Sequence, residues 1–151
     1  MPEWINTGFA DYARRMPREM ALALTELKPE PRGDKTSAGD IARIVEQEAQ
    51  RIEAALQNSN KDGLMVVLDE TGKTVSTRQL ADRITRWRDD GRDIAFVIGG
   101  ADGTAARLKN GADWLWSLSP LTLPHGLVRV VLAEQLYRAV SVIGNHPYHR
   151  A

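Results

Sequence analysis

Three glycines follow one apolar segment of this 151-residue chain and could bring its backbone close to a ligand. Gly99 and Gly100 come directly after the apolar run at residues 94–98, and Gly103 follows three residues later. Because glycine has no Cβ, the backbone at such positions can approach a group that a side chain would obstruct. A tight turn shows the same pattern, and the spacing matches neither a dinucleotide fingerprint nor a phosphate-binding loop. The glycines therefore indicate a turn or a cofactor site, and they argue against nucleotide hydrolysis.

A loop with two prolines joins the next apolar run to the last predicted helix. Residues 118–125 read Leu-Ser-Pro-Leu-Thr-Leu-Pro-His, with apolar side chains and little charge. The prolines stiffen this loop, and its apolar lining suits an adenine ring or a thioether better than a phosphate. Leu121 and Leu123 fit an ordinary hydrophobic core equally well.

The carboxyl end of the chain holds side chains suited to proton transfer and to anion binding. All three histidines lie there, at His125, His146 and His149, and from Pro120 onward there are three arginines against one acidic residue. A histidine can act as a base near neutral pH, and an arginine can stabilise negative charge on a substrate. Arg138 stands four residues after Glu134, so an intrahelical ion pair explains it as well as a substrate role does.

The composition excludes several classes of protein. With no cysteine there is no disulfide framework, no thiolate metal site and no cysteine nucleophile, and the terminal histidines have no carboxylate at ligand spacing, so we expect no metal. Twenty basic residues balance twenty acidic ones, so any RNA contact must come from local patches. The apolar runs are far shorter than the roughly 20 residues that cross a bilayer. We therefore expect a soluble, cytoplasmic protein of one domain, residues 1–151.

The order of the predicted elements indicates an α/β fold that positions these side chains. Apolar runs at 64–68 and 94–98 enclose a helical pattern at 76–88, which is the signature of a parallel crossover. Ligands in such folds bind at the carboxyl ends of the strands. The remaining predicted elements are helices at residues 4–16 and 40–56, a short helical stretch from 104, and strands at 21–27 and 114–118, with Asp40 as the expected cap of the second helix.

A last helix is predicted at residues 126–142, and its apolar side chains cover most of its circumference. A helix that lies on one side of a monomer does not need so wide an apolar surface. It is either a central helix within the subunit or part of a subunit interface, where obligate contacts are as apolar as cores.

Four ordered motifs of the chain resemble the RlmH methyltransferases of the SPOUT class. They are Val97-Ile-Gly-Gly-Ala-Asp-Gly103, Leu121-Thr-Leu-Pro-His125, Arg129-Val-Val-Leu-Ala-Glu-Gln-Leu-Tyr-Arg-Ala139 and Asn145-His-Pro-Tyr-His-Arg150. The resemblance extends more loosely upstream, through Leu68-Asp69 to the opening helix. It implies an S-adenosylmethionine-dependent homodimer that methylates N3 of a pseudouridine in 23S rRNA of the assembled ribosome. The alternative is a non-catalytic RNA-binding or ribosome-assembly factor that keeps the fold.

The resemblance also implies a fold, a trefoil knot at the carboxyl end of a mostly parallel sheet that helices flank. Members of the family open with a short apolar strand, which we expect to be missing here, so that a strand at 21–27 would lose a neighbour and expose an edge.

The resemblance further implies site residues. The cofactor would contact Leu68, Gly99, Gly100, Leu118, Ser119, Pro120, Leu121, Thr122 and Leu123. From side-chain chemistry rather than from the resemblance, the candidate catalytic residues are His125, Arg138, Tyr148 and His149, and the candidates for contact with substrate RNA are Arg129, His146 and Arg150.

Overall fold

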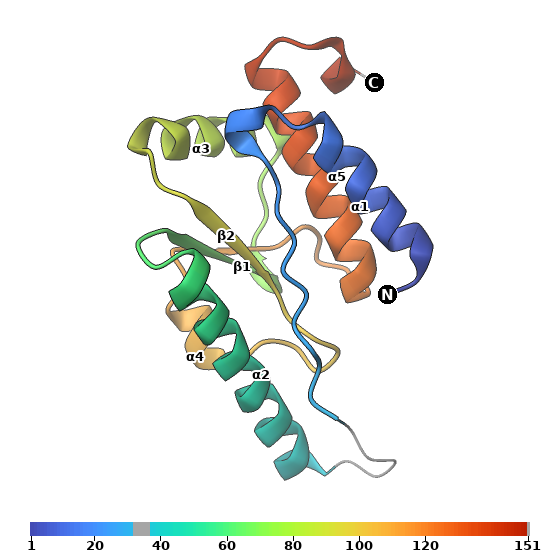
Figure 1. Cartoon of the computed structure of the whole chain (residues 1–151), viewed down its shortest axis with the longest axis vertical. Helices are drawn as coiled ribbons and strands as arrows, with labels where there is room; N and C mark the ends of the chain where they lie inside the picture. Colours follow the sequence, from blue (N-terminus) through green and yellow to red (C-terminus); the bar gives the residue numbers. More distant parts are fainter. Residues whose placement is uncertain (32–36, 151) are drawn as a thin grey trace.

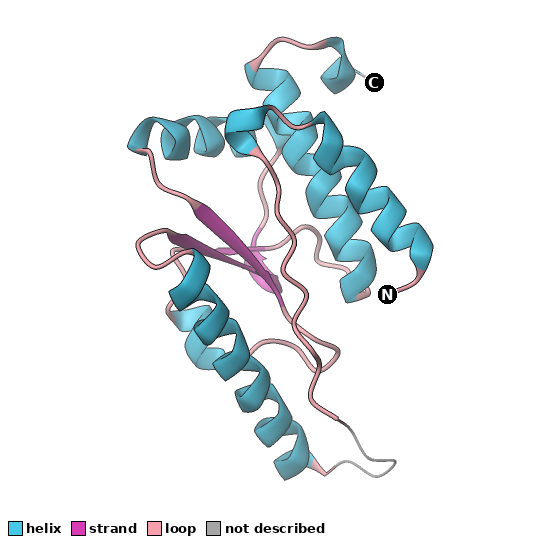
Figure 2. Ribbon diagram, in the orientation of Figure 1, coloured by secondary structure: helices cyan, strands magenta, loops and turns pink. Residues whose placement is uncertain are grey.

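A three-stranded parallel sheet lies at the centre of the computed structural model, which describes residues 1–31 and 37–150. The strand order is β2-β1-β3, with β1 at Leu64–Lys73, β2 at Ile94–Ile98 and β3 at Trp114–Trp116. Figure 2 shows the strands between two groups of helices. The predicted α/β fold with a parallel crossover is confirmed, since helix α3, Thr77–Asp90, connects β1 to β2.

The helices begin and end where local chemistry permits. Helix α1, Glu3–Arg15, ends two residues before Pro17, and a short 3₁₀ turn, η1, follows at Arg18–Met20. Helix α2, Ala38–Ser59, has a capping box in which Ser37 is the cap and Asp40 is its partner three residues later. The prediction that Asp40 caps this helix is therefore wrong by three residues.

Each face of the sheet carries its own apolar cluster. Val66 and Leu68 pack with α3 and with helix α5, His125–Ile143, whereas Met65 packs with α2 and with helix α4, Ala106–Asn110. Successive side chains of a strand point to opposite faces, so the apolar run of β1 supplies both clusters. In Figure 1, α2 and α4 lie together on one side of the sheet, away from α5.

The strand predicted at residues 21–27 is absent from the structure, which describes this segment as extended chain without ladder pairing. Leu22 packs against the main core, but Leu24 is 45% exposed. An isolated extended segment has no partner for its backbone groups, so an apolar pattern alone does not make a strand. None of the strands within the described residues precedes α1.

Helix α5 lies between α1 and α3 and contacts both (Figure 1). Leu132, Ala133, Leu136 and Ala139 are buried within this single chain. The predicted burial on more than one side is thus confirmed, and a position inside the subunit accounts for much of it. A 3₁₀ turn, η2, at Pro147–Arg150 follows α5 and ends the described chain.

Candidate cofactor and substrate site

Leu68 marks the edge of the sheet where the candidate cofactor segments meet. It is the register partner of Ile98 on one side and of Trp116 on the other. The glycine turn begins directly after Ile98, and the proline-bounded loop begins two residues after Trp116. The structure therefore brings the two segments to the same carboxyl edge, as parallel strands require.

The turn after β2 is a tight one that glycine makes possible. A Cβ on Gly99 would lie 3.1 Å from the carbonyl carbon of Gly103 and would collide with the Thr104 hydroxyl. The Gly103 amide donates to the Gly100 carbonyl at 3.0 Å, and Gly103 itself has a φ of +87°. The backbone of Gly99 is thus enclosed, whereas Gly100 and Gly103 face solvent.

A carboxylate from α2 borders this turn. Glu48 Oε1 is 2.9 Å from the place that a Cβ on Gly100 would take, and its other oxygen accepts a hydrogen bond from the Glu30 amide at 3.3 Å. A larger residue at position 100 would therefore displace this acidic group. The turn is open to solvent on one side and acidic on the other.

The loop after β3 is shaped by its own hydroxyl groups. Ser117 Oγ donates to the Ser119 carbonyl at 2.8 Å, and Ser119 Oγ accepts the Leu121 amide at 3.0 Å. The Leu121 side chain is 71% exposed, so the alternative that it is an ordinary core residue is wrong. Leu118 and Leu123 are half-buried, and Pro120 is exposed. The loop thus holds an apolar side chain out at the edge of the sheet.

The last residues of β1 leave the ladder and return, which brings further polar groups to the same edge. Leu68 and Lys73 both pair with Trp116, so the residues between them bulge outward. Gly72 permits the return, because a Cβ there would lie 2.6 Å from the Leu115 carbonyl oxygen. Partial burial acts to raise the pKa of Asp69. Hydrogen bonds from Thr71 and the nearby Lys109 ammonium outweigh this effect and lower the pKa.

The edge formed by these segments fits a ligand with an uncharged ring and a cationic group. Residues 118–124 carry no ionised side chain and present Leu121 to solvent, which suits an aromatic base or a thioether. Asp69, Glu70 and Glu48 supply carboxylate oxygens around it, and such oxygens accept hydrogen bonds from hydroxyl and ammonium groups.

The candidate catalytic residues lie at two places. His125 is the exposed first residue of α5, directly after the cofactor loop, whereas Tyr148 and His149 lie in η2 beyond the other end of that helix. A helix of 19 residues is about 28 Å long. The structure therefore does not bring His125 together with the C-terminal candidates within one chain.

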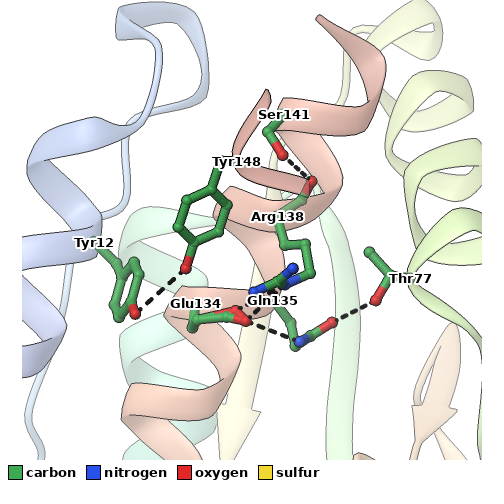
Figure 3. A network of polar contacts seen from close by, with 7 residues as sticks. All are labelled: Tyr12, Thr77, Glu134, Gln135, Arg138, Ser141 and Tyr148. Carbon is green, nitrogen blue, oxygen red and sulfur yellow. Dashed lines mark hydrogen bonds and ion pairs between the residues drawn. The ribbon is translucent and has the colours of Figure 1, made fainter. Parts of the chain in front are cut away.

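Arg138 and Tyr148 belong to one polar network (Figure 3). Arg138 Nε donates to Glu134 Oε1 at 3.0 Å, so the predicted alternative of an intrahelical ion pair is confirmed, and this hydrogen bond raises the pKa of Arg138. Two effects raise the pKa of Tyr148 to about 12: burial is the larger, and the hydrogen bond with Tyr12 is the next. Tyr148 is therefore protonated at neutral pH and is suited to donate a hydrogen bond.

The candidates for RNA contact differ in exposure. His146 and Arg150 are exposed, and His146 Nδ1 accepts the Tyr148 amide at 3.2 Å. The Arg129 side chain is only 9% exposed, and its Nη2 lies 3.6 Å from Glu26 Oε1. Within the described residues, Arg129 Nη1 and His149 Nδ1 are buried without a hydrogen-bond partner. The two exposed residues are therefore accessible from solvent, whereas Arg129 is covered in the single chain.

Comparison with known proteins identifies the family. The sequence model of a family described as "Predicted SPOUT methyltransferase" matches residues 1–149. The chain belongs to the SPOUT methyltransferases. It is 53% identical to "Ribosomal RNA large subunit methyltransferase H" of Methylobacillus flagellatus, over 99% of this chain and 92% of the relative. It is 54% identical to the protein of that name from Cupriavidus taiwanensis (100% and 93% covered) and 55% identical to that of Laribacter hongkongensis (99% and 92%).

Sequence reasoning missed three polar residues of this SPOUT methyltransferase. Glu70 accepts a hydrogen bond from Thr122, Glu48 borders the glycine turn, and Tyr12 contacts Tyr148. Glu70 follows an apolar run at the edge where ligands were expected, which is a usable signal. The positions of Glu48 and Tyr12 depend on long-range packing, so nothing in their local sequence indicates them.

Other site types receive no support within the described part of this SPOUT methyltransferase. No group of three or more histidine, aspartate or glutamate side chains is placed to hold a metal ion there, and no helix among residues 1–31 and 37–150 is long and apolar enough to cross a membrane. Two shallow surface hollows lie on α2, beside Gln47 and Arg51, and on α3, beside Asp82 and Arg86. Both are lined by residues other than the candidate cofactor segments.

Proposed function

We propose that this protein transfers the methyl group of S-adenosylmethionine to N3 of a pseudouridine in the 23S rRNA of the assembled ribosome. Residues 1–151 would act as one SPOUT-type domain in the cytoplasm, where ribosomes are. The relatives' names state activity on large-subunit ribosomal RNA, and the family is one of methyltransferases. The observation that carries the proposal is the register of Leu68 with Ile98 and Trp116, because a glycine turn and an apolar loop then follow the two strands that flank β1, at the same edge of the sheet.

The residues at this edge fit S-adenosylmethionine. Leu68 and the backbone of Gly99 and Gly100 would hold one side, and the loop Leu118, Ser119, Pro120, Leu121, Thr122 and Leu123 the other. Leu121 is exposed and positioned to cover an adenine ring, and the surrounding carboxylates suit a cationic ligand. When bound, the cofactor would supply an electrophilic methyl group.

The chain's own task is to orient the base and to remove its N3 proton. Orientation alone can supply several kcal/mol, and a general base about two to four powers of ten in rate. The raised pKa of Tyr148 favours it as a hydrogen-bond donor, so His125 and His149 are the candidate bases. Arg138, whose guanidinium lies 4.9 Å from the centre of the Tyr148 ring, would stabilise negative charge on the base together with Arg150.

We propose a homodimer because one chain holds its candidate residues too far apart. His125 and the cofactor loop lie at the start of α5, and Tyr148 and His149 lie beyond its end. In a twofold assembly with α5 near the axis, the tail of one chain can reach the cofactor loop of the other. Arg129, whose Nη1 is unpaired within the described residues, would find a partner there or in the RNA.

The fold we propose for the carboxyl end is the trefoil knot of the SPOUT class. Family membership supports it, because the family model covers residues 1–149.

The proposed substrate is ribosomal RNA within the ribosome. An exposed guanidinium, an exposed imidazole and an aromatic ring near the end of the described chain, namely Arg150, His146 and Tyr148, suit phosphates and splayed bases. With a net charge of zero, the protein has little general attraction for naked RNA.

Two measurements test the proposal. Calorimetry is expected to show micromolar binding of S-adenosylmethionine, and methylation is expected on ribosomes but hardly on isolated 23S rRNA. Equal rates on both substrates would count against a composite ribosomal surface. Replacing His125 and His149 separately by alanine chooses between the bases, and turnover within a few-fold of wild type in both would exclude histidine catalysis.

A further inference from the structure

Three tyrosine rings from three separate segments hold the end of the chain. Tyr12 lies on α1, Tyr137 on α5 and Tyr148 in η2. The centroid of the Tyr148 ring is 4.7 Å from that of Tyr137 and 6.5 Å from that of Tyr12, and the other two centroids are 6.4 Å apart. Tilted and edge-on rings at these separations attract one another. η2 therefore packs against α1 as well as against α5.

Polar contacts fix the same cluster from both sides. The Tyr148 and Tyr12 hydroxyl oxygens are 3.4 Å apart, and the guanidinium of Arg138 lies over the Tyr148 ring (Figure 3). On the other side, Arg15 lies 5.3 Å from the Tyr12 ring centre and 5.8 Å from that of Tyr137. Such cation–π contacts add to the ring packing.

The tail needs these contacts because its own structure is short. The chain reverses after α5 at Asn145, which has a φ of +55°, and the His146 amide donates to the Ser141 carbonyl at 2.8 Å. η2 then comprises only four residues, and so short a 3₁₀ turn has little stability of its own. Its place is therefore set by side-chain packing.

Helix α1 is a firm support for this packing. A Cβ on Gly8 would lie 3.3 Å from Val130 Cγ1, and a Cβ on Gly126 would lie 3.6 Å from Ile5 Cγ1. The two helices are thus closely packed, and this packing fixes the position of Tyr12 relative to α5.

We propose that Tyr12 is a positioning residue for methyl transfer: from α1 it fixes the place of Tyr148, and with it His149, without touching cofactor or substrate. This inference rests on the proposed function, which assigns those two tail residues to the substrate base. It makes the opening helix, which is far from the tail in sequence, part of the machinery that aligns the reacting base.

The test compares Tyr12→Ala with Tyr12→Phe and with the control Phe9→Ala, which removes another partly buried ring of α1. Phe9 makes no ring contact with the cluster within the described residues. We expect Tyr12→Ala to lower kcat roughly 10- to 100-fold, the effect of a misplaced catalytic group, with the Kd for S-adenosylmethionine within about two-fold. Tyr12→Phe keeps the ring and loses only a long hydroxyl contact, so it should restore turnover to within about three-fold.

Hydrogen exchange of the His146 and Tyr148 amides supplies a readout that does not depend on activity. We expect faster exchange in Tyr12→Ala and wild-type exchange in Phe9→Ala. Wild-type kcat in Tyr12→Ala, or equal losses in Tyr12→Ala and Phe9→Ala, would overturn the inference.

If the wild-type protein fails to methylate ribosomes, the proposed function fails. Faster exchange of the His146 and Tyr148 amides in Tyr12→Ala would then still support the inference that Tyr12 holds η2 in place. Unchanged exchange would overturn that inference together with the proposed function.

Discussion

The Thr122 hydroxyl donates a hydrogen bond of 2.6 Å to the Glu70 carboxylate and so joins two segments 52 residues apart. Thr122 belongs to the loop after β3, and Glu70 to the outward bulge of β1. Since both segments border the candidate cofactor site, this bond holds the loop in one position against the sheet. It is a direct structural reason for an ordered site.

Replacing Thr122 by valine keeps the shape of the side chain and removes this bond. A hydrogen bond to an exposed carboxylate contributes about 1 kcal/mol, so we expect the Kd for S-adenosylmethionine to rise about five-fold. Calorimetry measures it, with Thr7→Val on the exposed side of α1 as the control. An unchanged Kd in Thr122→Val would show that the loop position does not depend on Glu70.

Gly99→Ala tests the glycine turn. The added methyl group would press on the Gly103 carbonyl carbon and the Thr104 hydroxyl, so the turn must shift, and we expect at least about ten-fold weaker cofactor binding. The matched control is Gly91→Ala, where φ is +70° and no atom lies within 4 Å of the added Cβ. That variant should lose about 1 kcal/mol of unfolding free energy with normal binding. Equal cofactor affinity in the two variants would remove Gly99 from the site.

The raised pKa of Tyr148 predicts a dependence of stability on pH. Burial and the hydrogen bond with Tyr12 raise the pKa of Tyr148 from 10.0 to about 12, which favours the neutral form in the folded state. The resulting stabilisation is complete below pH 10 and is lost as the pH rises toward 12. Denaturant titrations should show that wild type loses more unfolding free energy over this interval than Tyr148→Phe. Parallel losses in both proteins would contradict the shift.

The proposed dimer predicts complementation between two inactive variants. Gly99→Ala impairs cofactor binding at the glycine turn, so it is nearly inactive at a cofactor concentration well below its Kd, and Tyr148→Ala disables the tail, each in every chain of its own dimer. If the cofactor segments of one chain work with the tail of the other, each mixed dimer has one site in which both parts are intact and one in which both are impaired. Half of all dimers are mixed when the two variants combine at random. Random mixing should then restore about a quarter of wild-type activity. No recovery, although mixed dimers form, would place the whole site within one chain.

The order of elements was predictable because each depends on local chemistry. The continuous apolar run of β1 contributes to two clusters on opposite faces of the sheet, and the helical pattern at 76–88 corresponds to α3. The location of the glycine turn and the proline-bounded loop at the same edge of the sheet also follows from the rule for parallel strands.

Features that depend on distant neighbours were not predictable. The segment at 21–27 has the apolar pattern of a strand but no partner, so it stays extended chain. The bulge that brings Glu70 to Thr122 requires a second pairing of Trp116 with Lys73. Tyr12 and Tyr148 are 136 residues apart, and no local pattern links them.

Mass spectrometry of the rRNA directly detects methyl transfer to N3 of a pseudouridine in the ribosome. Ribosomes that lack the modification are incubated with the protein and S-adenosylmethionine carrying a labelled methyl group, and the 23S rRNA is digested to nucleosides. We predict one labelled N3-methylpseudouridine per ribosome with wild type and almost none with Gly99→Ala. A label on another nucleoside, or none with a wild-type protein that binds the cofactor, would contradict the proposed function.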